Sequence, residues 1–330
     1  LRGTQVSGPG LKALKDLTQL EVLWLDNTSV TGAGLINVKP LSSLIELDLS
    51  DCKQIASGLE SLHGLTKLQR LKLNGVVLPQ KELDALYAAL PKCEITYSPD
   101  PLVKALVENQ NDLPKALATI AEVETDDKGE IVALNFEGTL ITNAAIEPLR
   151  NHKTLRKLDL SRCNVTDAGI EHLVTLPSLR FLNLSATAIS DKSLATLGSM
   201  AALEDLFLND TIVSDHGLEQ IKRLSKLHRL GLSGTQITDA SLKLVTHWKE
   251  LDALDLTKTA VTNGGMIELQ AVPFLQSLAL RDTQISDTGL ERLAKLTLLE
   301  TLWLDHTRVT KPGVRALQDA LPKCRIFAPW

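Results

Sequence analysis

A fixed period of 24 residues runs through most of this 330-residue chain. From Ile131 onward, eight segments begin at residues 131, 155, 179, 203, 227, 251, 275 and 299, with no insertion between them. Their shared form is LxxLxLxxTxVTDxGLxxLxxLxx, as in LRKLDLSRCNVTDAGIEHLVTLPS at residues 155–178. A period of this length predicts an array in which each repeat buries its apolar face against its neighbours.

Each repeat contains two hydrophobic spacings. The first half alternates like a short strand, whereas Ile170, Leu173 and Leu176 in the second half have the spacing of a helical segment packed by one face. One strand and one helical segment per repeat resembles the leucine-rich repeat, in a bacterial style related to the cysteine-containing and ribonuclease-inhibitor-like classes. The resemblance implies an α/β, right-handed solenoid with parallel strands on the concave face and helices on the convex face.

The repeats form two arrays. The first covers residues 1–97 and starts inside a repeat, so we expect it to be incomplete at its N-terminus. The second covers residues 131–330 and holds eight repeats. Each array ends in a similar segment with LPKC at its centre, where proline breaks the helical phase and a cap must cover the core. Residues 98–130 lack the repeat and predict two short helices, as a connector or an N-terminal cap of the second array.

Composition argues against several classes of function. A net charge of −5 and a pI near 5.9 give no electrostatic reason to expect nucleic-acid binding. No apolar run approaches the roughly 18 residues that span a bilayer, so we expect no direct membrane insertion by this segment. The resemblance leaves the localisation open with a lean towards the extracytoplasmic or periplasmic side, because such repeats are often one part of a longer, sometimes extracytoplasmic, polypeptide. The four cysteines lack metal-ligand spacing and are expected to be buried free thiols.

Two rows of polar residues have structural explanations. The ninth repeat position is mostly threonine, whose hydroxyl can bond the turn backbone after the strand; a row of nucleophiles is the alternative. Pairs such as Thr166-Asp167 and Ser214-Asp215 resemble helix N-caps with an acid in the first turn. Capping explains these acids without a metal, and we expect no cofactor. Trp248 occupies a leucine position and is expected in the core.

Specificity is expected at the third and fifth positions of each repeat, whose side chains point away from the core. Phe181 and Phe207 are predicted to be diagonal neighbours on adjacent strands, with Arg229 beside Asp205 and Gly231 leaving space beside Phe207. An aromatic pair next to an arginine is typical of a protein-binding hot spot. The alternative is that the two phenylalanines merely cover each other.

Two similar segments, LEVLWLDNTSVT and LETLWLDHTRVT, place Trp24 and Trp303 between leucines that should be buried. Strand alternation therefore points both tryptophans to solvent. Trp303 and His306 form a second candidate patch. A catalytic pairing of His306 with Asp282 is conceivable, but the pattern supplies no nucleophile.

The leading functional hypothesis is a non-catalytic module that binds a protein partner, of unknown identity, on the concave face. One alternative is a structural subunit of a larger assembly, in which Trp24, Trp303 or the array ends are buried against other subunits. A second alternative is the substrate-recognition part of a ubiquitin-ligase-type adaptor, because related repeats follow F-box segments.

Overall fold

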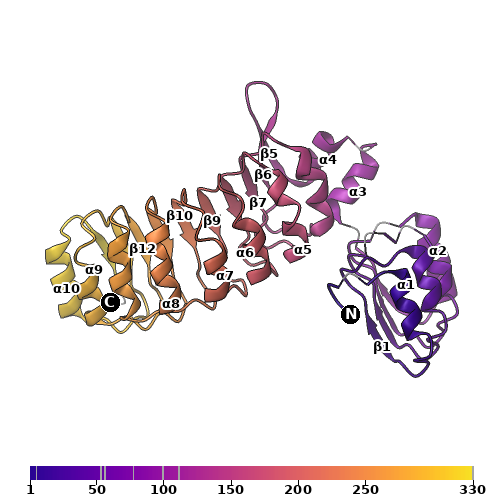
Figure 1. Ribbon diagram of the computed structural model, residues 1–330. Helices are drawn as coiled ribbons and strands as arrows, with labels where there is room; N and C mark the ends of the chain where they lie inside the picture. Colours follow the sequence, from indigo (N-terminus) through magenta and orange to yellow (C-terminus); the bar gives the residue numbers. More distant parts are fainter. Residues whose placement is uncertain are drawn as a thin grey trace. The chain divides into compact units, whose positions relative to one another are not determined.

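The computed structural model describes residues 1–4, 6–52, 54–55, 57–76, 78–98, 100–110 and 112–328. Its contacts divide the chain into two compact units. Unit 1 contains Leu1–Ile120 and Leu140–Pro148, and unit 2 contains Ala121–Thr139 and Leu149–Trp330. In each unit, parallel strands lie on one side and helical segments on the other (Figure 1).

Unit 1 contains a parallel sheet in the order β1-β2-β3-β4. Its strands are β1 (Val22–Trp24), β2 (Glu46–Asp48), β3 (Arg70–Lys72) and β4 (Glu94–Thr96). Its α-helices are α1 (Gly8–Leu11), α2 (Gln80–Ala89), α3 (Pro101–Glu108) and α4 (Leu113–Ile120). Its 3-10 helices are η1 (Lys12–Leu14), η2 (Gly32–Asn37), η3 (Leu59–Leu62) and η4 (Asn143–Ala145). The repeat leucines between the two layers are buried and form one continuous core.

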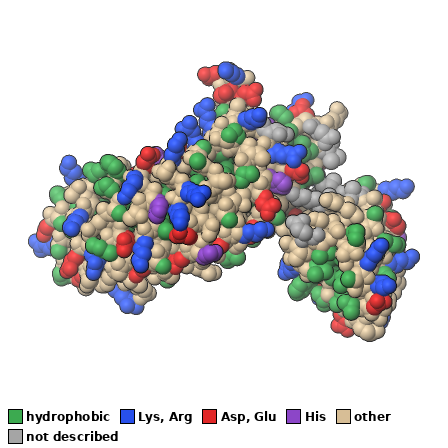
Figure 2. Space-filling model, in the orientation of Figure 1, with side chains coloured by type: hydrophobic (Ala, Val, Ile, Leu, Met, Phe, Trp, Pro, Cys, Tyr) green, Lys and Arg blue, Asp and Glu red, His purple; other side chains and the backbone are tan. Residues whose placement is uncertain are grey.

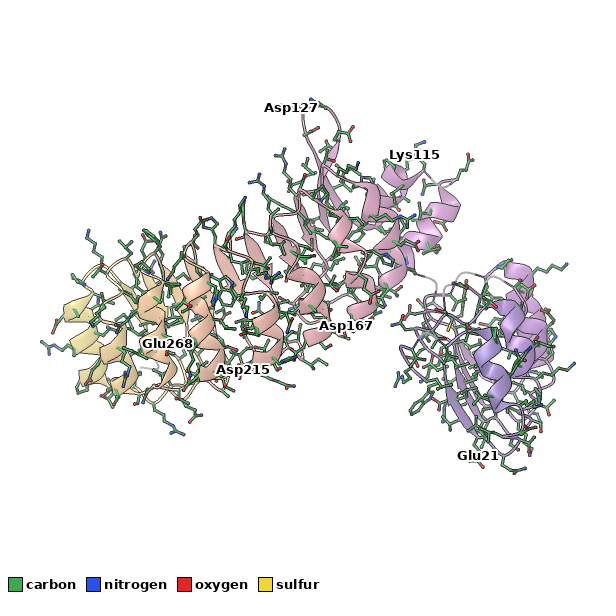
Figure 3. The ribbon with its side chains drawn as sticks, viewed as in Figure 1. Glu21, Lys115, Asp127, Asp167, Asp215 and Glu268 are labelled. Carbon is green, nitrogen blue, oxygen red and sulfur yellow. The ribbon has the colours of Figure 1, made fainter. Side chains whose placement is uncertain are left out.

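Unit 2 contains a ten-stranded sheet in which β5 is antiparallel to β6 and the other pairs are parallel. Its strands are β5 (Glu122–Thr125), β6 (Ile131–Asn135), β7 (Lys157–Asp159), β8 (Phe181–Asn183), β9 (Asp205–Phe207), β10 (Arg229–Gly231), β11 (Ala253–Asp255), β12 (Ser277–Ala279), β13 (Thr301–Trp303) and β14 (Arg325–Phe327). Asp127 lies near the tip of the β5–β6 hairpin, which projects from the sheet (Figure 3).

The helical segments of unit 2 are short, because strand, turns and helix share one 24-residue repeat. The α-helices are α5 (Asp167–Ile170), α6 (Asp191–Leu197), α7 (Asp215–Gln220), α8 (Asp239–Leu242), α9 (Asp287–Leu293) and α10 (Lys311–Ala320). The 3-10 helices are η6 (Leu173–Thr175), η7 (Lys243–His247) and η8 (Gly265–Ala271), and η5 (Glu147–Asn151) crosses the division between the units.

The α/β leucine-rich-repeat solenoid predicted from the sequence is confirmed. Sheet register matches repeat phase, so Leu206 pairs with Leu182 and Leu230, and all three are buried. Trp248 is also buried, as its leucine-equivalent position predicted, and its indole Nε1 donates a hydrogen bond to the Ile221 carbonyl at 3.4 Å.

The threonine row is structural. The Thr211 hydroxyl donates to the Leu208 carbonyl at 2.6 Å, and the Thr259 hydroxyl donates to the Leu256 carbonyl at 2.6 Å. These bonds satisfy backbone carbonyls where the chain leaves each strand. Just before these threonines, the backbone adopts the left-handed conformation, for example at Asp210 (φ 53°) and His306 (φ 58°).

Three of the predicted helix N-caps, Ser190, Ser214 and Thr238, make the expected side-chain bond. Thr166 and Ser286 stand at the N-cap positions of α5 and α9 without a side-chain cap bond. The acids beside the caps have a further role. The Ser214 hydroxyl accepts a hydrogen bond from the His216 amide at 3.3 Å, which caps α7. The Asp191 carboxylate in the preceding repeat accepts hydrogen bonds from the Ser214 amide at 2.8 Å and hydroxyl at 2.6 Å. These acids therefore join consecutive repeats, and Asp167 and Asp215 lie along one edge of unit 2 (Figure 3).

The segment between the arrays forms the two short helices that the sequence predicted, α3 and α4, followed by β5. Contacts group both helices with unit 1. The Asp100 carboxylate accepts hydrogen bonds from the Leu102 amide at 2.9 Å and the Thr142 amide at 2.5 Å. Burial raises the pKa of Asp100. The assignment of residues 98–130 to a cap of the second array stays a proposal.

Both array ends add a strand to their sheet. Residues of β4 pair with β3, and residues of β14 pair with β13, in the same parallel register as the repeats before them. Cys52, Cys163 and Cys324 are buried and Cys93 is partly exposed, and all four are free thiols. Within the described part of the chain, no helix is long and apolar enough to cross a membrane.

Candidate functional site

The outward face of the unit 2 sheet carries most of the residues expected to bind a partner. In β9 the central Leu206 is buried, while Asp205 and Phe207 point to the opposite side. We call this solvent side of the unit 2 sheet the sheet face. Lysine and arginine side chains are interspersed with acidic ones over the visible surface of unit 2 (Figure 2).

Phe181 and Phe207 contact each other as predicted. Their ring centroids are 5.5 Å apart with an angle of 48° between the ring planes, a tilted aromatic pair. The space that Gly231 leaves is not empty, however. A Cβ at Gly231 would lie 2.8 Å from the Phe207 Cδ1 atom, so the phenylalanine ring and Asn209 occupy that space. Gly231 therefore allows Phe207 to lie close to the neighbouring strand.

Arg229 is paired with Asp205 on the adjacent strand. The Arg229 Nε atom donates to Asp205 Oδ1 at 2.7 Å, and a second guanidinium nitrogen donates to Oδ2. The hydrogen bonds to Asp205 raise the pKa of Arg229 above its ordinary value. The arginine is therefore an oriented, neutralised group rather than a free cation.

Trp303 lies between an aromatic ring and an arginine. Its ring stacks on Phe327 of β14, with centroids 5.9 Å apart and planes 9° apart. The Arg281 guanidinium carbon lies 5.4 Å from the Trp303 ring centroid, and Arg281 Nε contacts Asp305 Oδ2 at 3.0 Å. These contacts leave Trp303 half-buried and fix its orientation.

A hollow of about 320 Å³ lies between these two aromatic groups on the sheet face. Phe207 and Arg229 line one end, and Trp303 and Arg281 line the other. The other lining residues are Asn209, Leu230, Gly231, Ala253, Leu254, Asp255, Ser277 and Ala279. Small side chains on three adjacent strands form its floor, which is why the sheet face is hollowed there.

Not every predicted site residue belongs to this hollow. Phe181 contacts Phe207 from outside it, and Asp205 contributes by orienting Arg229. His306 does not line it; its Nδ1 atom lies 3.0 Å from Asp282 Oδ1, and its side chain is 76% exposed. Among the described residues, no serine, threonine or cysteine side chain hydrogen-bonds His306, so this pair does not form a catalytic triad.

Trp24 lies in unit 1, in a different set of contacts. Its Nε1 donates to Glu46 Oε1 at 3.0 Å, and the Arg2 guanidinium carbon lies 5.1 Å from its ring centroid. Arg70 also binds Glu46, so Glu46, expected at an outward position, is buried beneath its neighbours. The hydrogen bonds from Trp24 and Arg70 lower the pKa of Glu46 to about 2.

Two residues that line the hollow, Asp255 and Arg281, and one that stacks on Trp303, Phe327, were not among the predicted site residues. Phe327 is 24 residues after Trp303, but it follows the LPKC segment, which we interpreted as a cap. Asp255 and Arg281 occupy outward positions, but nothing in the sequence distinguishes them from other exposed charges.

Among the described residues, no group of three or more His, Cys, Asp or Glu side chains could hold a metal ion.

Comparisons with known proteins agree with a leucine-rich-repeat fold. A family model described as "Leucine Rich repeat" matches residues 151–174 and 273–294. The structure is similar to that of an internalin (inlF) from Listeria monocytogenes, with 21% sequence identity and a TM-score of 0.51. That match covers 100% of this chain and 85% of the internalin chain.

A second solved structure, internalin C2 (inlC2) from the same bacterium, has 18% identity and a TM-score of 0.40, covering 90% of this chain and 92% of its own. No curated protein matches the sequence. At 21% identity, the likeness to the first internalin concerns the fold alone.

Proposed function

Because this chain is a leucine-rich-repeat protein, we propose that it is a non-catalytic module whose sheet face in unit 2 binds a protein partner. Leucine-rich repeats serve generally in protein–protein interaction, which supports the broad class. The finer assignment depends on one observation: two half-buried aromatic groups, at Phe207 and Trp303, border a hollow on an otherwise regular sheet.

The composition of this surface supports a protein partner. Aromatic and arginine side chains are the residue types that most often dominate binding energy at protein interfaces. Here both arginines are already oriented by Asp205 and Asp305, so little side-chain entropy is lost when a partner contacts them. Phe181 extends the surface on one side, and His306 provides a polar rim on the other. Trp24, in unit 1, is proposed as a separate contact point.

The proposal can be tested by comparative capture. The immobilised chain is exposed to an extract of its own source, and retained proteins are quantified for the unmodified chain and for Phe207→Ala and Trp303→Ala. We expect at least one protein whose affinity falls about tenfold or more in both variants. The matched control is Phe274→Ala, which removes a phenylalanine that is 57% exposed in the turn before β12, away from the hollow.

Equal retention by all four chains would contradict binding on the sheet face. Light scattering of the purified chain tests the alternative of an assembly subunit. A stable large oligomer formed by this chain alone, and disrupted by Trp303→Ala or Trp24→Ala, would favour assembly over recognition of a different protein.

A further inference from the structure

The hollow on the sheet face contains an isolated carboxylate. Of the described residues that line it, only Asp255 is acidic. Asp255 lies at the end of β11, in register with Gly231 on β10 and Ala279 on β12. Its two neighbours along this row are therefore the smallest side chains available, and the carboxylate stands in the middle of the hollow.

No basic side chain of the described chain neutralises Asp255. The structure describes no nitrogen of a lysine, arginine or histidine within 4.0 Å of its oxygens. Its Oδ1 atom accepts a hydrogen bond from the Thr257 amide at 2.9 Å, which orients the side chain, and the described residues provide no side-chain donor to Oδ2. A partly buried carboxylate with a fixed orientation and no counter-charge favours a cation.

The two arginines of the hollow are held away from Asp255. Arg229 on β10 is bonded to Asp205 on β9, and Arg281 after β12 is bonded to Asp305 after β13. Each arginine thus pairs with an acid one strand further from β11. An acidic ligand would have to displace one of these acids and approach Asp255, whereas a basic ligand meets an unpaired carboxylate.

The remaining walls suit an apolar stem with a charged end. Apart from Asp255, the floor between Phe207 and Trp303 is made of small residues, Gly231, Ala253 and Ala279. A volume of about 320 Å³ is at the lower end of the range for ligand pockets, so it fits a side chain better than a whole secondary-structure element.

We propose that this hollow binds one lysine or arginine side chain of the protein partner, with its cation on Asp255 and its methylene stem on the small-residue floor. This inference rests on the proposed function, because the side chain comes from the partner that the sheet face binds. Long basic side chains bury their methylene groups on apolar surface while their charged end is paired, as this arrangement requires.

The experiment uses blocked amino acids as probes. N-acetyl-argininamide, N-acetyl-lysinamide, N-acetyl-norleucinamide and the α-amide of N-acetyl-glutamate are titrated into the full chain, and the backbone amide NMR signals of Gly231, Asp255 and Thr257 are followed. We expect saturable shifts with the two cationic probes. Binding of the uncharged norleucine probe should be about tenfold weaker or more, because it lacks the charge-assisted bond.

Two variants locate the effect. Asp255→Asn keeps the shape and an oxygen for the Thr257 amide, and should weaken the cationic probes about tenfold or more. Asp159→Asn is the matched control, since Asp159 has the equivalent position on β7 and is bonded to Ser161 and Asn183. Ala253→Leu fills the floor and should abolish binding without removing any charge.

Equal binding of norleucine and lysine probes, or unchanged binding in Asp255→Asn, would overturn the proposal. Stronger binding of the glutamate probe would overturn it in favour of an anion held by the arginines. The proposed function is tested separately. Partner capture that is unaffected by Phe207→Ala would contradict protein binding on the sheet face. The probe titration would still decide whether Asp255 binds a basic side chain.

Discussion

The Asp215 carboxylate accepts hydrogen bonds from both the backbone amide and the hydroxyl of Thr238, at 2.9 and 2.6 Å. The two residues belong to consecutive repeats, so this contact joins one helix start to the next. The Ser241 hydroxyl also donates to the same carboxylate. Equivalent contacts link Asp167 with Ser190, Asp191 with Ser214, Asp239 with Thr262, Asn263 with Ser286, and Asp287 with Thr310.

Replacing Asp215 by alanine should lower the free energy of unfolding of unit 2 by about 1–3 kcal/mol, because several partly buried donors lose their acceptor. Asp215→Asn should cost less, since Asn263 makes the equivalent bonds to Ser286 in another repeat. Urea denaturation of the three chains measures the difference. Equal stability of the alanine variant and the unmodified chain would show that the contact does not stabilise the array.

Glu46 should remain ionised in mild acid. The pKa of Glu46, about 2, lies below the ordinary value near 4.3. Its interactions therefore stabilise unit 1 fully at pH values above about 4.3, and this stabilisation is lost as the pH falls towards 2. Carboxylate NMR at pH 3 should therefore still show an ionised side chain. Trp24→Phe, which removes the indole donor, should raise the pKa; Trp303→Phe, in the other unit, should leave it unchanged.

Gly231→Ala should displace Phe207 while the repeat still folds. The added methyl group would lie 2.8 Å from the Phe207 ring and 2.8 Å from the Asn209 side-chain oxygen, so both side chains must move. The cost to stability should stay below about 2 kcal/mol, because the crowded atoms belong to side chains. Partner binding should weaken, and the Phe181–Phe207 ring contacts seen by NMR should change.

Gly64→Ala is the matched control for that substitution. No atom lies within 4 Å of a Cβ built at Gly64, so the change should be neutral or slightly stabilising. A Gly231→Ala chain with unchanged ring contacts and unchanged partner affinity would contradict the role assigned to this glycine.

Cys93 should be the first thiol to react with Ellman's reagent. Cys52 and Cys163 are buried and donate to the Leu25 and Phe136 carbonyls at 3.0 and 3.2 Å. Burial raises the pKa of Cys324 to about 11, which leaves little thiolate at pH 8.

Burial and the nearby Glu94 charge also raise the pKa of Cys93, but its partial exposure permits slow attack. In Cys93→Ser the early phase should disappear, and the three buried thiols should react only when the chain unfolds. Four thiols reacting at one rate in the folded protein would contradict this arrangement.

Much of the fold follows from the sequence, because many leucines must agree in phase for repeats to share one core. Leu206, Trp248 and Thr259 have positions that the period fixes, and the structure places each as expected. The pairing of Phe181 with Phe207 and of Arg229 with Asp205 was also predictable, since strand register equals repeat phase.

The hollow itself was not predictable. Whether Gly231 leaves a gap depends on the side-chain torsions of Phe207, which the repeat pattern does not fix. Phe327 follows a segment that interrupts the pattern, so only the pairing of β14 with β13 shows that it stacks on Trp303.

The sequence by itself therefore determined the solenoid, its register and which side chains face outward. The reason is that the repeat leucines can all be buried together in only one alignment of neighbouring repeats. The tertiary structure alone decided which outward residues act together. Arg229 and Arg281 turn away from Asp255 because Asp205 and Asp305 lie within hydrogen-bonding distance on the outer strands. That choice of partner depends on distances of a few ångströms between side chains, and it leaves one carboxylate unpaired between two aromatic groups.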